Sequence, residues 1–230
     1  MSEVLSVQPA EGRAWARCWQ PPPKCSGSLM SSASEIRTHI LHKATELFVR
    51  RGYHGISMRE LAEHVGVSKA GLYYHFKSKE ELFLAILVEN VNRIEALLQE
   101  ARRVGPNPRQ RIDFLFKKML AFAPEQRAII RLASQELGEL AEPARRAFLE
   151  LYHERFTGQV EAILAEGVEQ GYLRPLDTHK ATWILLGMMY PFFYPTQEAE
   201  IGALEDAVDL MLTIFFEGAQ ARPATQMEEG

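Results

Sequence analysis

Residues 67–83 read VSKAGLYYHFKSKEELF and combine two tyrosines, a histidine and three lysines in one short stretch. The polar tips of these side chains disfavour a core position, and their rings disfavour a purely solvent-exposed surface. A partner with anionic groups beside flat apolar surface would suit both properties. Nucleic acid presents phosphates and base edges together, so the stretch predicts a nucleic-acid partner.

Two short helices joined by a tight turn are predicted in and just before this stretch. Ser57 and Glu60 have the spacing of a capping box, which starts the first helix. Gly66 can adopt the left-handed backbone that stops it. Ser68 is the expected N-cap of the second helix. A helix, a three-residue turn and a helix form the helix-turn-helix arrangement, whose second helix enters the major groove by its N-terminal end.

The outer face of the second helix is expected to contact DNA. With Leu72 and Phe76 facing inward, small residues at its start would let the backbone approach base edges. Tyrosine and histidine can donate to phosphate oxygens or pack on thymine methyl groups, and lysines would lie over phosphates. The expected DNA-binding residues are Ser57, Ser68, Lys69, Ala70, Gly71, Tyr73, Tyr74, His75, Lys77 and Lys79.

Residues 40–82 contain ELF, RGY, GVSK, LYYHF and KSKEEL in that order, and this run resembles the DNA-binding domain of the TetR family of bacterial repressors. The resemblance implies base contacts from Lys69, Ala70 and Gly71, and backbone contacts from Tyr73, His75 and Lys79. Many relatives have threonine at the position of Gly71. Reading of the operator there would therefore depend on close approach or on a neighbour such as Tyr74.

Helical patterns continue along the chain without strand signals. A first helix is expected from a cap at Ser32, with Ile36 and Ile40 on its inner face, to Gly52. Ser78 and Glu81 form another capping-box pattern, which opens a long helix. Later helices are expected to open at Asn107–Pro108, Pro124, Pro143 and Asp177, the third of them running to Gly171.

The predicted fold is all-α, with an N-terminal three-helix helix-turn-helix domain on a larger helical ligand-binding and dimerisation domain. The predicted segments are a disordered leader (1–33, with Trp15 and Trp19), the DNA-binding domain (34–81), the ligand-binding and dimerisation domain (82–220) and a disordered tail (221–230).

Charge follows the same division. The whole chain has net charge −4, but residues 34–81 hold eight Lys and Arg against six Asp and Glu. The acidic remainder argues against an architectural DNA-bending protein, which needs a basic surface throughout. Both cysteines, Cys18 and Cys25, lie in the leader, and residues 181–194 are too short to span a bilayer. These features predict a soluble, cytoplasmic bacterial protein, associated with the nucleoid when bound to DNA.

The last two expected helices, about 177–194 and 198–218, carry more apolar surface than one small bundle can hide. The family resemblance implies that they form a four-helix dimer interface. A homodimer would read a palindromic operator with two recognition helices.

Methionine and aromatic residues recur on the helices of the second domain. At this spacing they are commonly core, and the resemblance implies that some line an effector cavity. The expected ligand-binding residues are Phe114, Met119, Phe122, Phe148, Tyr152, Phe156, Trp183, Met188, Met189 and Phe192. The run GYLRPLDTHKATWILLGMMYPFFYP (171–195) resembles regulators of fatty-acid and sterol breakdown, which respond to acyl-CoA esters. Candidate arginines for the CoA phosphates are Arg102, Arg103, Arg109, Arg127 and Arg131.

Enzymatic functions find little support in the sequence. The glycines form no phosphate-binding loop, and no nucleophile elbow occurs. His39 and His42 have no third metal ligand near them in sequence. We therefore expect no catalytic residue, no metal and no cofactor. The predicted function is a ligand-responsive transcriptional repressor that senses an acyl-CoA or another apolar effector and controls lipid-catabolism or efflux genes. The alternatives are an architectural or constitutive DNA-binding protein without an effector, and a protein-interaction module.

Overall fold

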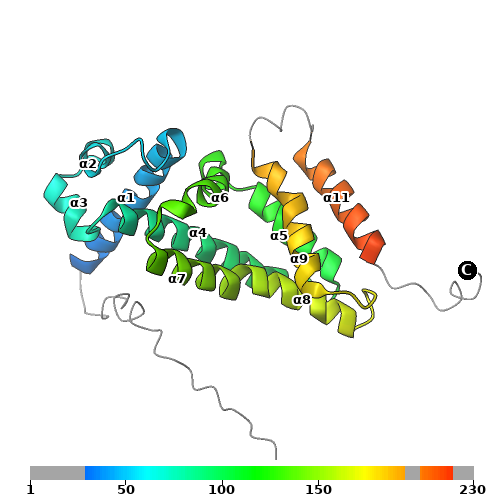
Figure 1. Cartoon of the computed structure of the whole chain (residues 1–230). Coiled ribbons are helices and arrows are strands. Elements are labelled where there is room, and N and C mark those ends of the chain that lie inside the picture. Colours follow the sequence, from blue (N-terminus) through cyan, green and yellow to red (C-terminus); the bar gives the residue numbers. More distant parts are fainter. Residues whose placement is uncertain (1–28, 195–202, 220–230) are drawn as a thin grey trace, which may run out of the picture. The chain divides into compact units, whose positions relative to one another are not determined.

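The computed structural model describes residues 29–194 and 203–219, with side chains from residue 33, and every regular element in these ranges is a helix (Figure 1). The all-α prediction is confirmed. The chain divides into two compact units, Met1–Ile36 and Arg37–Gly230. The described residues of the first unit form the start of helix α1 (Leu29–Arg51), which continues into the second.

Three helices form the N-terminal part of the second unit. The rest of α1 packs with α2 (Met58–Val65) and α3 (Lys69–His75). Ile40, Phe48 and Leu61 are fully buried between them, which fits the apolar face predicted for each helix. The three-helix group is then joined to the rest of the chain by α4 (Lys79–Ala101).

Helix α4 contributes to two apolar cores. Its first half, including Leu82 and Leu87, packs in the core of α1–α3. Ile94 and Leu98 from its second half belong to the other core. A displacement of α4 would therefore shift the helices of both cores, because close-packed interiors transmit displacement.

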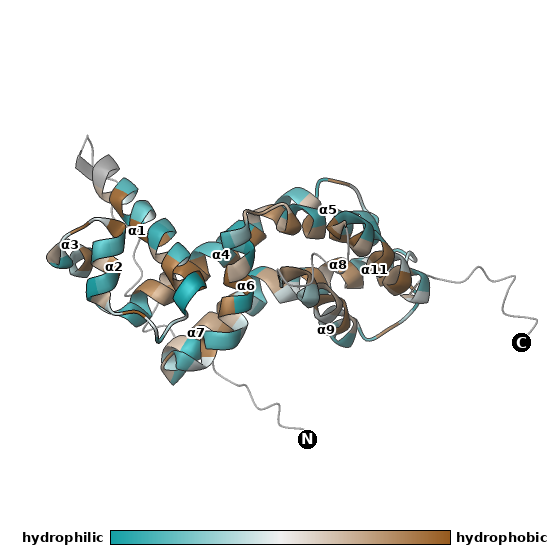
Figure 2. Cartoon of the chain, turned by 90° about the horizontal axis from the view of Figure 1, so that it is seen from above, coloured by the Kyte–Doolittle hydropathy of each residue, from teal (hydrophilic) through white to brown (hydrophobic). Residues whose placement is uncertain are grey.

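The remaining helices form the second part of the fold. Figure 2 shows hydrophobic residues concentrated along α8, α9 and α11, which belong to the same core. The bounds are α5 (Pro108–Leu120), α6 (Pro124–Glu136), the 3₁₀ turn η2 (Leu137–Glu139), α7 (Glu142–Tyr152), α8 (Gly158–Glu169), α9 (Thr178–Met189), the 3₁₀ turn η4 (Tyr190–Phe193) and α11 (Leu204–Ala219).

A π turn, η3 (His153–Thr157), interrupts the single helix expected between Pro143 and Gly171. The Gly158 N–H donates to the His153 carbonyl, a bond that spans five residues instead of four. A Cβ atom at position 158 would lie 2.9 Å from that carbonyl oxygen, so glycine suits this close approach. The extra residue changes the rotation of α8 relative to α7.

Several helix boundaries differ from the predictions. Helix α1 begins at Leu29, so Ser32 lies inside it and does not cap it, and Ile36 is 42% exposed instead of facing inward. Ser78 does cap α4, but the carboxylate of Glu81 accepts the Lys77 N–H at 2.7 Å, which leaves the predicted capping box incomplete. The helices that correspond to the predicted ranges 177–194 and 198–218 are α9, which η4 continues to Phe193, and α11, while residues 198–202 lie outside the described residues.

Part of the predicted organisation lies outside the described residues. Trp15, Trp19 and both cysteines fall in residues 1–28, and the tail falls in 220–230. The boundaries at 33/34 and 81/82 remain predictions.

Candidate nucleic-acid interface and internal cavity

The turn between α2 and α3 has the predicted local geometry. Ser57 and Glu60 form a closed capping box: the Glu60 N–H donates to Ser57 Oγ at 3.2 Å, and the Ser57 N–H donates to Glu60 Oε2 at 2.8 Å. Gly66 has φ 80°, the left-handed conformation that ends α2. Ser68 Oγ then accepts the Gly71 N–H at 3.0 Å and caps α3. Ser57 thus fixes the start of α2, and Ser68 fixes the start of α3.

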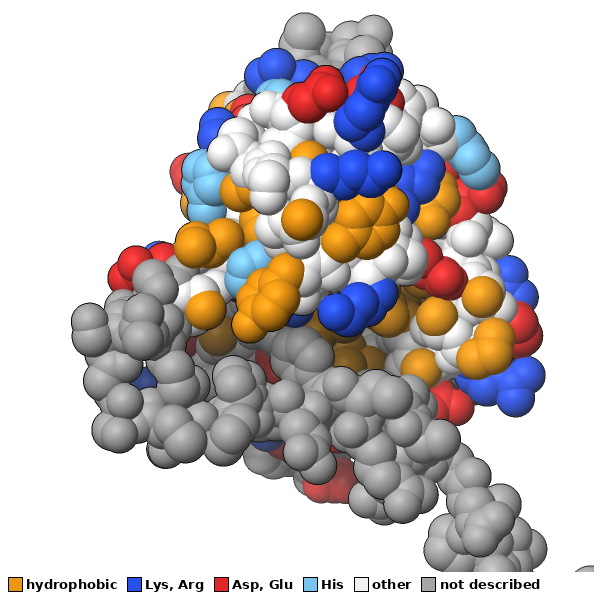
Figure 3. Space-filling model, turned by 90° about the vertical axis from the view of Figure 1, so that its left-hand side faces the viewer, with side chains coloured by type: hydrophobic (Ala, Val, Ile, Leu, Met, Phe, Trp, Pro, Cys, Tyr) orange, Lys and Arg blue, Asp and Glu red, His pale blue; other side chains and the backbone are white. Residues whose placement is uncertain are grey.

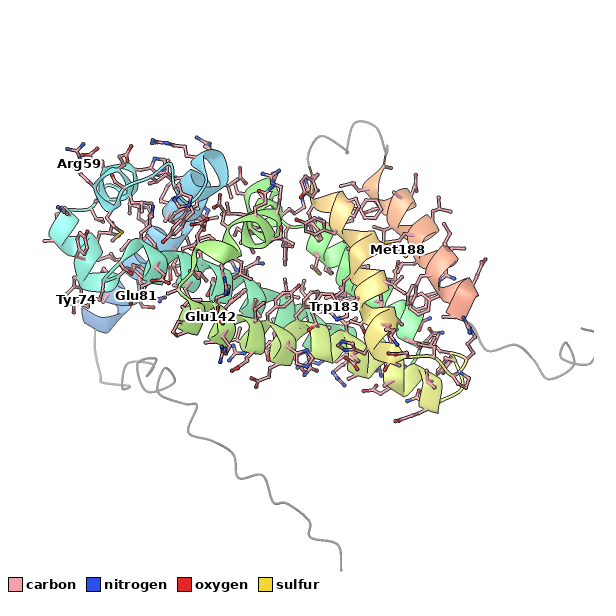
Figure 4. All side chains as sticks on the ribbon, viewed as in Figure 1. Arg59, Tyr74, Glu81, Glu142, Trp183 and Met188 are labelled. Atoms are coloured by element: carbon pink, nitrogen blue, oxygen red, sulfur yellow. The ribbon has the colours of Figure 1, made fainter. Side chains whose placement is uncertain are left out.

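Helix α3 has a buried face and an exposed face. Leu72 and the adjoining Phe76 are fully buried, which matches the inward positions predicted for them. Tyr74 is 75% exposed and Tyr73 is 38% exposed. Figure 4 places Tyr74 at the outer end of the three-helix group. In Figure 3, lysine and arginine side chains lie beside hydrophobic and histidine side chains over this end of the molecule. Also exposed are Lys69, Ala70 and Lys77.

Gly71 lies on the exposed side of α3, and little free space separates it from Ser68, the N-cap of this helix. A Cβ atom there would lie 3.1 Å from Ser68 Oγ, the atom that accepts the Gly71 N–H. A larger residue would have to displace the capping hydroxyl by a few tenths of an ångström. The absence of a side chain therefore leaves both the cap and the surface of α3 open to a close partner.

Lys79 points in a different direction from the one expected. Its Nζ donates to the carbonyl oxygens of Tyr53 at 2.8 Å and Ile56 at 3.0 Å, and lies 4.3 Å from the centre of the Tyr53 ring. The ammonium group thus holds the connection between α1 and α2. Its charge is directed at the protein backbone, whereas Lys77 extends into solvent.

His75 is half-buried at the end of α3. Burial, and secondarily the positive charge of Arg37, lower the pKa of His75 below its usual range. The imidazole is therefore neutral at pH 7, and it can donate one N–H without carrying charge.

A cavity of about 310 Å³, partly open to solvent, lies among α4, α5, α6, η2, α7, η3, α9 and η4. This volume is within the range of small-ligand sites, roughly 300–1,000 Å³. Apolar and aromatic side chains dominate its lining, so it suits an apolar ligand. The residues that line it include Leu87, Asn90, Val91, Ile94, Ala133, Ser134, Phe148, Tyr152 and Tyr190.

The structure brings some predicted cavity residues together and leaves others elsewhere. Those that line the cavity are Met119, Phe148, Tyr152, Phe156, Trp183 and Met189. Those that do not are Phe114, Phe122, Met188 and Phe192. Phe122, Met188 and Phe192 pack in or against the core of the second domain, and Phe114 lies under the ammonium of Lys118 at 5.6 Å. Figure 4 labels Trp183 and Met188, which lie at different positions along α9.

Sequence reasoning missed the contribution of α4. Leu87, Asn90, Val91 and Ile94 line the cavity, and all four come from one face of this helix. The signal was present, because Asn90 is a polar residue at an inward position between apolar ones. It is only 7% exposed.

Hydrogen-bonding groups border the cavity in two places. Ser134 Oγ contacts the Tyr190 hydroxyl, and the Tyr194 hydroxyl donates to Tyr190 at 3.0 Å. Trp183 Nε1 donates to His179 Nε2 at 3.3 Å. Burial raises the pKa of Tyr152 to about 12, so its phenol is protonated at pH 7.

The five candidate arginines are not gathered at one mouth. Arg102 pairs with Glu166 at 3.2 Å, and Arg109 donates to Thr213 Oγ1 at 2.8 Å. Arg131 lies 5.8 Å from the Tyr194 ring, beside the Ser134–Tyr190 contact. Arg131 is therefore the candidate best placed near the cavity rim. Arg127 lies one turn before it on α6, and Arg103 is exposed after α4.

An apolar surface remains exposed on α9 and α11. Trp183 and Ile184 are 55% and 59% exposed, and Leu210 and Ile214 are 62% and 59% exposed. Exposed apolar groups of this size on neighbouring helices mark an interaction surface. The prediction placed a dimer interface on these helices.

A polar contact joins the α1–α2 connection to the end of α6. His54 Nε2 lies 2.6 Å from Glu139 Oε2, and the Tyr53 N–H donates to Glu136 Oε1 at 3.5 Å. His54, Glu136 and Glu139 have potential ligand atoms within 4.8 Å of one another. His39 instead contacts the Val65 carbonyl at 3.2 Å.

Two family comparisons cover most of the chain. Residues 40–86 match the family described as bacterial regulatory proteins, tetR family, and residues 83–192 match the tetracyclin repressor-like C-terminal domain. The chain is 32% identical over 155 residues to the HTH-type transcriptional activator FasR of Mycolicibacterium smegmatis, covering 67% of this chain and 68% of that protein. It is 27% identical over 139 residues to the HTH-type transcriptional repressor KstR2 of Mycobacterium tuberculosis, covering 60% and 70%.

Solved structures share the fold. The regulator PfmR from Thermus thermophilus superposes with a TM-score of 0.67 at 26% identity, covering 77% of this chain and 97% of that one. AibR in complex with isovaleryl coenzyme A and operator DNA superposes with a TM-score of 0.65 at 25% identity, covering 79% and 98%. Among the described residues, no helix is long and apolar enough to cross a membrane.

Proposed function

Because the chain belongs to the TetR family of bacterial transcriptional regulators, which bind operator DNA and act as dimers, we propose that it is a repressor released from its operator by an apolar effector. The observation that carries the proposal is the apolar cavity of about 310 Å³ beside the helix that leads to the DNA-binding part. The proposed effector class is an acyl-CoA ester, the class to which the isovaleryl coenzyme A in the AibR complex belongs.

The DNA contacts proposed here follow the exposed face of α3. Lys69, Ala70 and Gly71 lie at its N-terminal end, where a recognition helix meets base edges. The proposed backbone contacts are Tyr73, Tyr74, His75 and Lys77. Ser57 and Ser68 act through the caps that orient α2 and α3, and each can also offer its hydroxyl to a phosphate. Lys79 supports the same surface by holding the α1–α2 connection.

Helix α4 provides the proposed link between effector and DNA. Leu87 and Val91 line the cavity and also belong to the core shared with α1–α3. An effector that separates the cavity walls would move α4 and with it the recognition helices. Two recognition helices must match successive major grooves, about 34 Å apart, so a small rotation is enough to weaken binding.

Helix α6 offers a second connection. Ser134 borders the cavity on α6, and Glu136 two residues later accepts the Tyr53 N–H. The contact between His54 Nε2 and Glu139 Oε2 lies beside it. Both contacts end on the α1–α2 connection that Lys79 holds, so movement of α6 would reach the DNA-binding part by a short route.

The alternative is a constitutive DNA-binding protein whose cavity has no regulatory role. The apolar lining, the position of α4 on its wall and the rim near Arg131 favour an effector. Among the relatives, FasR is named an activator and KstR2 a repressor, so the direction of control needs its own measurement. Deletion of the gene should raise transcription from the operator if the protein represses, and lower it if the protein activates.

The central experiment measures release from DNA. An operator selected from genomic fragments is titrated by fluorescence anisotropy, and dodecanoyl-CoA, octanoyl-CoA and free CoA are added. Dodecanoyl-CoA should release the protein and free CoA should not. Each buried CH₂ contributes about 0.8 kcal/mol, so the four-carbon difference should weaken release by about 3 kcal/mol, over a hundredfold.

A cavity-filling variant tests the location of the effector. Ala133 lines the cavity from α6, so Ala133→Leu adds bulk there without changing a residue of the exposed apolar surface on α9 and α11. It should bind the operator normally and resist release. Ala96→Leu on α4 is the matched control, because Ala96 is exposed and lies outside the cavity lining. Equal release of Ala133→Leu and the parent protein would contradict the assignment of the cavity.

A further inference from the structure

Asn90 is a buried amide in the wall of an otherwise apolar cavity. Its side chain is 7% exposed, and its Oδ1 atom has no hydrogen-bond partner among the described residues. Burial of a carbonyl oxygen without a donor costs free energy, so a ligand that supplies a donor is favoured there. The cavity therefore has an unfilled acceptor position.

Asn90 lies between this cavity and a second hollow, whose lining includes Thr38, Arg93 and Gln126, and no donor from the described residues on either side bonds to Oδ1. Leu87, Val91 and Ile94 from the same helix are apolar. The polar groups of Ser134 and Tyr190 contact each other at the rim, and Trp183 donates to His179. These groups have partners within the protein, whereas Asn90 Oδ1 has none among the described residues.

We propose that Asn90 determines effector specificity by accepting a hydrogen bond from a hydroxyl or amide N–H group embedded in an otherwise apolar ligand. The inference rests on the proposed function, because it takes the cavity to be the effector site. Two sources could supply the donor in a CoA ester: a hydroxyl group on the acyl chain, or an amide N–H of the pantetheine arm. Their shared chemistry is a single donor flanked by apolar groups.

The first test isolates the donor from CoA chemistry. Cyclohexanol and methylcyclohexane differ by a hydroxyl in place of a methyl group, and both fit a cavity of this volume. Calorimetric titration of each compound gives the ratio of their two dissociation constants. In Asn90→Leu, the preference for cyclohexanol relative to methylcyclohexane should fall about tenfold, the scale of one hydrogen bond.

Two further variants complete this test. Asn90→Ala cannot overpack the cavity and should show the same loss if the leucine variant fails to fold. Leu97→Ile, on α4 but outside the cavity lining, is the control and should keep the parent ratio. An unchanged ratio in both Asn90 variants would overturn the inference, as would failure of the parent protein to bind either compound.

The second test identifies the source of the donor. Operator release is measured with decanoyl-CoA and 3-hydroxydecanoyl-CoA in the parent and in Asn90→Leu. Weaker release by the hydroxylated ester alone supports the chain hydroxyl, and equal weakening of both esters supports the pantetheine amide. If both esters release the two proteins equally, Asn90 does not select this effector and the inference fails. If neither ester releases the parent while cyclohexanol still discriminates, the acyl-CoA proposal fails and the role of Asn90 stands.

Discussion

The apolar surface on α9 and α11 gives a prediction about dimerisation. Leu210 is 62% exposed, and Ile214 lies one turn further along the same helix. If the two copies meet through this surface, Leu210→Ala removes apolar area from the interface twice, because a two-fold interface contains each residue in both copies. The folded protomer should be unaffected, since most of the side chain contacts no other part of it.

The magnitude follows from the uncovered fraction of the side chain. Full burial of a leucine side chain is worth about 1.5–3 kcal/mol, so covering the 62% that is exposed is worth about 1–2 kcal/mol. Alanine keeps a small part of this contribution. Counted in both copies, the loss is about 2–3 kcal/mol, which corresponds to a roughly 30- to 150-fold weaker dimer.

Sedimentation equilibrium over a wide concentration range measures the dimer dissociation constant directly. Val104→Ala is the matched control, because Val104 is 44% exposed but belongs to the connection between α4 and α5 and not to α9 or α11. The control should change the dissociation constant less than about twofold. Equal effects of the two substitutions, or no effect of Leu210→Ala, would show that the copies meet elsewhere or not at all.

Four further substitutions test the DNA-binding part. Lys79→Met should destabilise the fold by about 1–3 kcal/mol, because two backbone carbonyls lose their donor, and should leave the salt dependence of DNA binding unchanged. Lys77→Met should leave the stability of the fold unchanged and lower the salt slope of DNA binding by about one unit. An equal change of salt slope in both variants would show that Lys79 also contacts a phosphate. Tyr74→Ala should weaken operator binding without shifting the thermal midpoint, since the ring is 75% exposed. Unchanged operator affinity in the anisotropy titration would show that Tyr74 does not contact DNA. Hydrogen bonds from the N–H and hydroxyl of Ser57 lower the pKa of Glu60 from 4.5 to about 2, so the stability it supplies is complete above pH 4.5 and lost as the pH falls toward 2. Glu60→Gln should therefore flatten the fall of the thermal midpoint in that window, and an identical pH profile would contradict the pKa shift.

The helix-turn-helix part could be predicted closely because short-range rules determine it. Ser57, Ser68 and Gly66 each act on a backbone group within five residues. Such local interactions can be predicted from the sequence alone. The contacts of Lys79 were not predicted, because its partners lie 23 and 26 positions away in the sequence. A long, flexible side chain can reach either solvent or a distant carbonyl, and only the packed structure decides between them.

The cavity was predicted less well, because its walls depend on how helices are rotated against one another. Met188 and Met189 are adjacent and chemically identical, yet only Met189 lines the cavity. Apolar periodicity identifies a buried face but does not distinguish a core side from a cavity side when both are apolar. Asn90 was overlooked for a related reason, since a single polar residue does not disturb the hydrophobic pattern of a 23-residue helix.

The π turn at His153–Thr157 means that the shape of the cavity depends on the number of residues between α7 and α8. Loss of one residue there would restore ordinary helical spacing and rotate α8 by about 100° relative to α7. Phe148 would keep its place on the cavity wall, while Val160 and Leu164 would turn out of the core. A library of single-residue insertions and deletions in this turn would therefore sample new pocket shapes that side-chain substitution cannot reach, without altering any residue of the DNA-binding surface.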